Sequence, residues 1–275
     1  ANRALSRICA PWTEKQIPIK WRKRIYSAVG LFWDVSWHEF KPNLEYYPTF
    51  KHFFIRPLEY PRTLAKSDMI SPSDGRVLTF GEIDRDKPVL EQIKGVTFKL
   101  PHFLYGYDGK EMHANMLDVQ RSNGNKLYYT IIYLAPGDYH RFHAPSNGIK
   151  IKCINHIVGD LYAVKPSWLK KIPGLFTLNE RIVLSGTWRE DLFFAYVPVG
   201  AFNVGTICLT ADDAIKTNQK THDADVWYKN NGENRNKKND VNVEYTPYEQ
   251  STAQTPFIKK YIQHFGSGEE IEYEK

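Results

Sequence analysis

The side chains best suited to chemistry lie together in one short stretch of this 275-residue chain. Residues 138–143 contain an acid, two bases and a cation almost side by side: Asp138, His140, Arg141 and His143. Imidazole titrates near neutral pH, so either histidine could act as a general acid or base. The two histidines would face opposite ways on a strand, but they converge on a turn, where residues i and i+3 share a side.

An apolar run comes just before this cluster. Residues 126–135 are rich in β-branched and aromatic side chains, which predicts a strand buried on both faces. Pro136 and Gly137 then end the strand, because proline cannot donate to a ladder and glycine permits a sharp bend. We therefore expect the polar cluster at the rim of a core strand, on a rigid support.

The residues alone leave other roles open for the histidines and for Asp74. The two histidines could be surface residues that follow a strand. They could also bind zinc, with His156 or Asp138 as a further ligand, but the H-x-x-H spacing lacks the helical H-E-x-x-H frame. Asp74, in the turn-forming segment SPSDG, could merely hydrogen-bond its own backbone.

A catalytic interpretation rests on a resemblance. The segment LAPGDYHRFHAP at 134–145 resembles a signature of the phosphatidylserine decarboxylase family. Further similar segments are YPTF at 47–50, FFIRPL at 53–58, SPSDG at 71–75, LNER at 178–181 and VGAFNVG at 199–205. They follow the family's order, so the resemblance covers most of the chain from about residue 12 to residue 205.

The resemblance implies an Asp-His-Ser triad that cuts its own chain. Asp74 matches the acid that orients the imidazole, and His143 matches the base that activates the serine. Attack by the serine gives an ester, and elimination then releases the β chain and leaves a dehydroalanine. The dehydroalanine takes up water and loses ammonia to become a pyruvoyl group, the covalent cofactor. That group forms a Schiff base with phosphatidylserine and accepts electrons as carbon dioxide leaves, which yields phosphatidylethanolamine. His140 matches the residue assigned to this decarboxylation.

The family's serine lies in a Leu-Gly-Ser-Thr-like motif before an apolar strand. Residues 265–268 contain a Gly-Ser step, but four glutamates follow, so we interpret this segment as a flexible turn. We therefore expect this chain to be the β subunit, with the pyruvoyl group derived from a serine that is not present in it. The expected partners are the small α subunit from the same precursor and, as the family implies, a second αβ unit in a homodimer.

The charge of the chain is uneven. Residues 1–62 carry 11 Lys and Arg against 5 Asp and Glu, whereas the two kinds balance in the rest of the chain. The helix predicted at residues 19–39 has one apolar stripe, formed by Trp21, Ile25, Val29, Phe32, Trp33 and Trp37. The basic residues of this helix lie at its N-terminal end, where the helix dipole disfavours cations. We expect an anionic membrane surface as the partner, with peripheral attachment to an unspecified membrane, and no nucleic acid.

The predicted fold class is α+β, with N-terminal amphipathic helices followed by a mainly antiparallel β barrel or sandwich core. Strand-like runs fall at 77–80, 96–100, 127–134, 149–154, 181–185 and 193–199. The expected division is a helical membrane-associating region at 1–64 and a β-rich catalytic domain at 65–275. An Asn- and Lys-rich stretch at 229–256 is expected to be a mobile insertion, because it has almost no apolar residues to bury.

Two other functions compete with the decarboxylase. One is a metal-dependent hydrolase that uses His140, His143 and Asp74, and the other is a non-catalytic lipid-binding domain with a basic helix. Stoichiometric zinc would favour the first, whereas the decarboxylase interpretation requires no metal. Vesicle binding without release of carbon dioxide from phosphatidylserine would favour the second.

Overall fold

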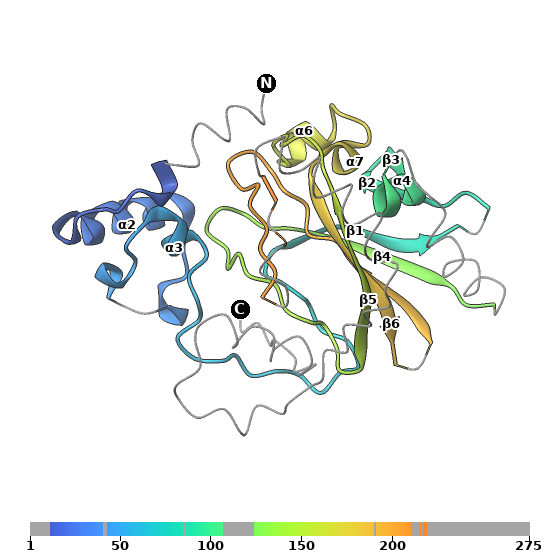
Figure 1. Cartoon of the computed structure of the whole chain (residues 1–275), viewed down its shortest axis with the longest axis horizontal. Coiled ribbons are helices and arrows are strands. Elements are labelled where there is room, and N and C mark those ends of the chain that lie inside the picture. Colours follow the sequence, from blue (N-terminus) through green and yellow to red (C-terminus); the bar gives the residue numbers. More distant parts are fainter. Residues whose placement is uncertain are drawn as a thin grey trace.

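A computed structural model of the chain describes residues 12–40, 43–84, 86–106, 124–189, 191–210, 215 and 217–218. Helices α2 (Ile19–Trp33) and α3 (Phe50–Phe54) lie at one end of the molecule and the strands at the other (Figure 1). The architecture is α+β with antiparallel strands, as predicted. The insertion expected at 229–256 lies outside the described residues.

An aromatic cluster holds the helical part together. The two helices are joined through the 3-10 turns η1 (Trp37–Glu39) and η2 (Leu44–Tyr46). Tyr26 is fully buried and stacks on Phe53, with 4.5 Å between the ring centroids. The buried members of the cluster are Tyr26, Val35, Phe40, Leu44, Tyr47, Phe53 and Tyr139. Because Tyr139 comes from the polar stretch after a strand, this cluster also joins the helical part to the candidate site.

The predicted N-terminal helix is shorter than expected, and only part of its apolar stripe is packed against the protein. The helix ends at Trp33, because Asp34 adopts a left-handed conformation (φ 56°). Its buried residues are Tyr26 and Gly30, and Gly30 lies against the ring of Trp37, which returns over the helix. Trp21, Ile25 and Phe32 of the predicted stripe are exposed, whereas Val29 and Trp33 pack against the aromatic cluster.

The described strands form three antiparallel sheets, and none of them closes into a barrel. Strand β1 (Arg76–Ile83) pairs with β4 (Leu127–Tyr133), and β2 (Val89–Ile93) pairs with β3 (Val96–Lys99). The third sheet has the order β5 (Ile149–Ile157), β6 (Arg181–Trp188), β7 (Leu192–Tyr196). Strand β2 was not predicted. One hydrophobic cluster contains residues of all three sheets, including Ile83, Leu90 and Val183, together with α4 (Leu100–Tyr105).

Strand β4 was predicted to be buried on both faces, and for its first half this is wrong. Tyr128 is 69% exposed and Thr130 is also exposed, whereas Leu127 and Tyr129 are half-buried. The exposed side chains alternate along this half of the strand, so one face of β4 meets solvent there; among the described residues, β4 pairs with β1 alone. The predicted stop holds, since the strand ends at Tyr133, three residues before Pro136.

The LNER segment organises the loops around β6. Two short helices, α6 (Pro166–Leu169) and α7 (Leu175–Leu178), come before it. The amide of Asn179 donates to the carbonyl oxygens of Tyr162 and Gly200, at 2.9 and 2.8 Å. Arg181 is fully buried, and its guanidinium donates to four backbone carbonyl oxygens, those of His102, Phe103, Thr177 and Asn179. Buried polar groups need such partners, so this segment ties four stretches of chain to the sheet.

Residues 192–210 contain β7 and then irregular chain. Within the ranges that the structure describes, no helix has the length and apolar character needed to cross a bilayer.

We predict that Gly186→Ala will destabilise the protein strongly. Gly186 lies opposite a bulge in β5, and a methyl group on it would overlap the carbonyl oxygen of Lys150. We expect a loss of at least about 2 kcal/mol in the free energy of unfolding, because the neighbour is backbone and cannot rotate away. Urea denaturation measures this loss. The control is Gly81→Ala in β1, where the added methyl would lie 3.4 Å from the ring of Tyr129; an equal loss in both variants would contradict the explanation.

Candidate active site

The candidate site is built on the loop that follows β4. The carboxylate of Asp138 accepts the backbone N–H of Ala135 at 2.6 Å, which closes the turn at Pro136 and Gly137. Gly137 is buried so closely against the backbone of Trp33 and Asp34 that a side chain on it would overlap them. Burial raises the pKa of Asp138. The loop is therefore pressed against the end of α2, with Asp138 acting as its internal brace.

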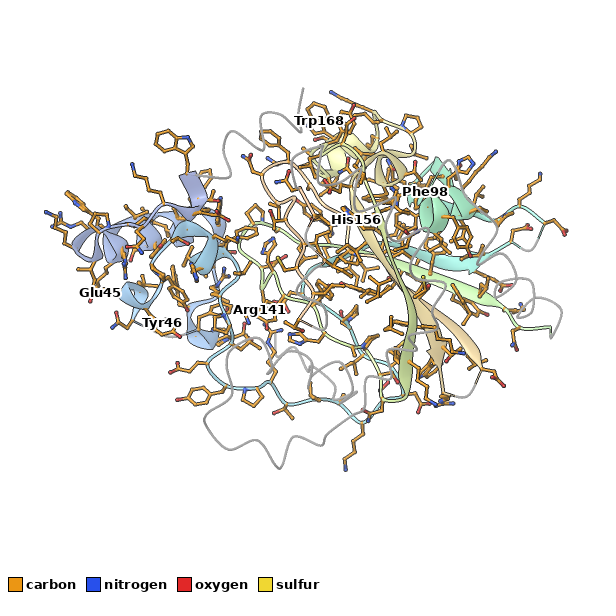
Figure 2. All side chains as sticks on the ribbon, viewed as in Figure 1. Glu45, Tyr46, Phe98, Arg141, His156 and Trp168 are labelled. Atoms are coloured by element: carbon orange, nitrogen blue, oxygen red, sulfur yellow. The ribbon has the colours of Figure 1, made fainter. Side chains whose placement is uncertain are left out.

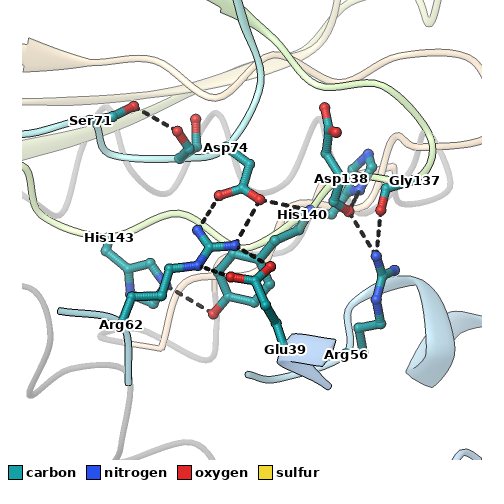
Figure 3. A network of polar contacts seen from close by, with 11 residues as sticks. Glu39, Arg56, Arg62, Ser71, Asp74, Gly137, Asp138, His140 and His143 are labelled. Atoms are coloured by element: carbon teal, nitrogen blue, oxygen red, sulfur yellow. Dashed lines mark hydrogen bonds and ion pairs between the residues drawn. The ribbon is translucent and has the colours of Figure 1, made fainter. Parts of the chain in front are cut away.

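Arg56, from the chain after α3, holds this loop from below (Figure 3). Its Nη2 donates to the carbonyl oxygens of Gly137 and Asp138, at 2.5 and 3.3 Å. The guanidinium is 1% exposed and lies 4.1 Å from the ring centroid of Phe40. Burial lowers its pKa to about 10, so it stays charged at neutral pH. The FFIRPL segment thus contributes a structural cation to the site, which its sequence alone did not indicate.

His140 occupies an apolar environment. Its ring lies 3.9 Å from the ring of Phe54, centroid to centroid. Its Nδ1 lies 2.9 Å from the carbonyl oxygen of Asp138, so Nδ1 carries the proton and donates it. Burial lowers the pKa of His140 to about 4. The imidazole is therefore neutral at pH 7, and its Nε2 carries a basic lone pair.

His143 and Asp74 meet through Tyr139. The hydroxyl of Tyr139 lies 2.9 Å from Nε2 of His143, and the two rings are parallel within 8°. The backbone N–H of Tyr139 points to Oδ2 of Asp74 at 3.4 Å, and the N–H of His143 donates to the carbonyl of Pro72 at 2.7 Å. Burial raises the pKa of Tyr139, so its phenol remains protonated. The structure therefore brings Asp74 and His143, 69 positions apart in the printed sequence, into one network (Figure 3).

Asp74 does not merely bond its own turn, because Arg62 binds it with a two-pronged contact. Nη1 and Nη2 of Arg62 lie 2.5 and 3.0 Å from its two carboxylate oxygens. The other side of the same guanidinium binds Glu39, at 2.6 and 2.8 Å. Burial alone would lower the pKa of Arg62, but the hydrogen bonds to Asp74 and Glu39 outweigh it and hold the pKa above its usual value. Sequence reasoning missed both Arg62 and Glu39, which carry no motif of their own.

The remaining sequence candidates are structural in this arrangement. Arg141 donates from Nε to the carbonyl oxygen of Ile55 at 2.6 Å. His156, the third ligand considered for a zinc site, pairs instead with the buried Glu180 at 2.9 Å. Figure 2 shows His156 among the strands and Arg141 beside the helical part. Among the described residues, no group of three or more His, Cys, Asp or Glu side chains is placed to hold a metal ion.

These features define an α+β protein whose site combines two histidines, an aspartate and buried arginines at the meeting point of its helical and sheet parts. The chain belongs to the phosphatidylserine decarboxylase family, since the model of the family described as phosphatidylserine decarboxylase matches residues 50–241. The matched range contains Asp74, His140 and His143.

Individual relatives agree with this family. The chain is 35% identical over 78% of its length to the mitochondrial phosphatidylserine decarboxylase proenzyme of Caenorhabditis elegans, covering 53% of that protein. It is 36% identical over 80% of its length to the corresponding Rattus norvegicus protein, covering 56% of it. The match to the phosphatidylserine decarboxylase proenzyme of Plasmodium knowlesi is 34% identical and covers 80% of this chain and 60% of that one. The chain thus spans little more than half the length of these relatives.

We predict that His140 makes the protein less stable in mild acid. Its pKa is about 4 in the folded state, against about 6.5 in an unfolded chain. Between these values the unfolded chain binds more protons, so stability falls as the pH drops from about 6.5 to 4. The full shift corresponds to a loss of up to about 3 kcal/mol.

The measurement is the free energy of unfolding by urea at several pH values. The variant His140→Gln should lose less stability than the wild type over this interval. The matched control is His38→Gln, because His38 is exposed. Parallel pH profiles for the wild type and His140→Gln would contradict the buried neutral imidazole.

Proposed function

We propose that this chain is the large, or β, subunit of a self-processed phosphatidylserine decarboxylase, a carbon–carbon lyase. The partner is a small α subunit that carries the pyruvoyl group, and the substrate is phosphatidylserine. Support comes from the family to which the chain belongs and from relatives that are named proenzymes. The geometry that carries the proposal is the network of Asp74, Tyr139 and His143.

In the proposed self-cleavage, His143 takes the proton of a serine hydroxyl on the segment that becomes the α subunit. The phenol of Tyr139 is within hydrogen-bonding distance of Nε2 of His143 and its ring lies parallel to the imidazole, so both restrict the orientation of the base. Asp74 supplies a negative charge at this network, which stabilises the imidazolium that forms when the proton is taken. The guanidinium of Arg62 holds that carboxylate in place.

His140 serves a different step in the proposal. A pyruvoyl group offers acceptor oxygens and supplies an electron sink when carbon dioxide leaves. The donor and the base around the loop suit such a group, since they comprise a protonated phenol and a neutral imidazole. His140, held as the Nδ1–H tautomer by Asp138, can shuttle a proton through Nε2 at the carbon that loses carbon dioxide. The ring of Phe54 lies against the imidazole ring of His140 and covers part of it.

The two histidines are separable by mutation. In the full-length protein that contains this chain, His143→Ala should remain a single uncut polypeptide. His140→Ala should be cut but should lose at least about 100-fold in turnover, as expected when a general acid–base is removed. Mass spectrometry follows the cutting, and release of carbon dioxide from phosphatidylserine follows turnover. His38→Ala is the control and should behave as the wild type; an active His140→Ala enzyme would contradict the assignment.

The proposal includes a peripheral membrane location and pairing of two-chain units, which the family resemblance implies. Several relatives are named mitochondrial, whereas those from Plasmodium are not. Helix α2 exposes Lys20, Lys23 and Arg24, and Leu31 and Phe32 at its other end are each 85% exposed. Exposed cations together with large apolar side chains suit an anionic lipid surface. Arg22 is excluded from this set, because it donates to the carbonyl oxygens of Ile17 and Glu45.

We predict that Lys20→Glu, Lys23→Glu and Arg24→Glu together will abolish binding to anionic vesicles. Each basic residue contributes about 1 kcal/mol near such a surface, so the triple reversal should weaken binding by at least about 100-fold. Sedimentation with phosphatidylserine-containing vesicles measures this, and phosphatidylcholine vesicles give the background. The matched control reverses Lys150 and Lys152, which are exposed on β5. Equal binding of both variants would refute the role of α2.

A further inference from the structure

Glu39, Arg62 and Asp74 form a chain of charges that crosses from the helical part to the candidate site (Figure 3). Glu39 belongs to η1, Asp74 comes just before β1, and Arg62 lies on the segment between the two parts. The three side chains are 23%, 11% and 13% exposed for Glu39, Arg62 and Asp74, so the contacts are largely shielded from solvent. Four short N–O contacts join them.

The planar guanidinium has two edges that can each bind a carboxylate, and here both edges are used. Its Nη2 is shared, because it contacts Glu39 at 2.8 Å and Asp74 at 3.0 Å. The two carboxylates therefore flank one cation at close range. Without that cation, two like charges would face and repel one another in a partly buried space.

Other charged groups near Asp74 do not replace Arg62. Arg56 is directed at the carbonyl oxygens of Gly137 and Asp138. Asp138 adds a further negative charge to the surroundings of Asp74, and His140 is neutral. Arg62 is thus the cation that holds the Asp74 carboxylate with two hydrogen bonds, among the described residues.

We propose that Arg62 is a positioning residue that holds the Asp74 carboxylate in its orientation for the reaction, and that Glu39 completes its support from the helical part. This inference rests on the function proposed above, because Asp74 matters there as the acid of the self-cleaving triad. It also makes the N-terminal helical part a component of the site. Arg62 acts through Asp74 and has no need to touch the substrate.

The arrangement predicts different effects for substitutions of Arg62 and of Glu39. Arg62→Gln leaves Asp74 beside Glu39 with no cation, whereas Glu39→Gln leaves the contact between Arg62 and Asp74 in place. The double variant, Glu39→Gln with Arg62→Gln, removes the like-charge repulsion that the single Arg62 variant creates. It should therefore recover part of the lost function, which a simple loss of structure would not do.

The test uses self-cleavage of the full-length protein that contains this chain. Arg62→Gln should slow cleavage by about 10- to 100-fold, as expected for loss of a charge-assisted contact. Glu39→Gln should slow it less than about 5-fold, and the double variant should be faster than Arg62→Gln alone. The cleavage rate of Arg62→Lys should fall between those of the wild type and Arg62→Gln, because lysine keeps the charge but cannot make the bidentate contact. The control is Lys126→Gln, which removes an exposed pair with Glu82.

A wild-type cleavage rate in Arg62→Gln, or an equal loss in Glu39→Gln, would overturn the inference. If the wild type itself is never cut, the proposed function fails. The charge arrangement is then tested by urea unfolding of the wild type, Arg62→Gln, Glu39→Gln and the double variant. There, Arg62→Gln should be the least stable, and the added Glu39→Gln should restore stability at pH 7. A double variant that is less stable than Arg62→Gln would overturn the arrangement independently of any activity.

Discussion

A guanidinium group that leaves water must find acceptors for its donors, and this requirement organises the chain. Arg56, Arg62 and Arg181 are buried or nearly so, and each joins segments that are distant in sequence. Arg56 holds the loop after β4, Arg62 joins the helical part to Asp74, and Arg181 collects the backbone carbonyls around β6. Since a buried cation without partners is costly, the segments that it contacts cannot separate independently. The candidate site lies where the first two of these arginines act.

The two histidines of the candidate site lie three positions apart and have different environments. His140 lies against Phe54 with its Nδ1–H committed to a backbone carbonyl, so it is held neutral as one tautomer. His143 lies against Tyr139, in the network that contains Asp74. The turn after β4 directs the two rings to different neighbours. Separate environments suit separate chemical steps, since a base that must become charged needs a nearby carboxylate and a proton shuttle needs an available lone pair.

Prediction from the sequence succeeded where the determinants are local. The strand before Pro136, the stop itself and the cluster of ionisable groups after it all depend on neighbouring residues, and the structure contains them. It failed for features that depend on how distant segments of the chain pack together. One face of β4 meets solvent in its first half, and α2 ends at Trp33, where Asp34 adopts a left-handed conformation and Trp37 folds back over Gly30. Residue composition does not reveal which face of a strand the rest of the chain will cover.

By itself, the sequence determined the family, the local turn that presents His140 and His143, and the basic character of the N-terminal quarter. Only the tertiary structure decided that Asp74 meets Arg62 and Glu39, and that Arg56 reaches the loop after β4. The physical reason is the range of the interactions. Turns and strands follow from adjacent residues, whereas an ion pair depends on which side chains the folded core brings together, and residues 23 and 12 positions apart share no local pattern.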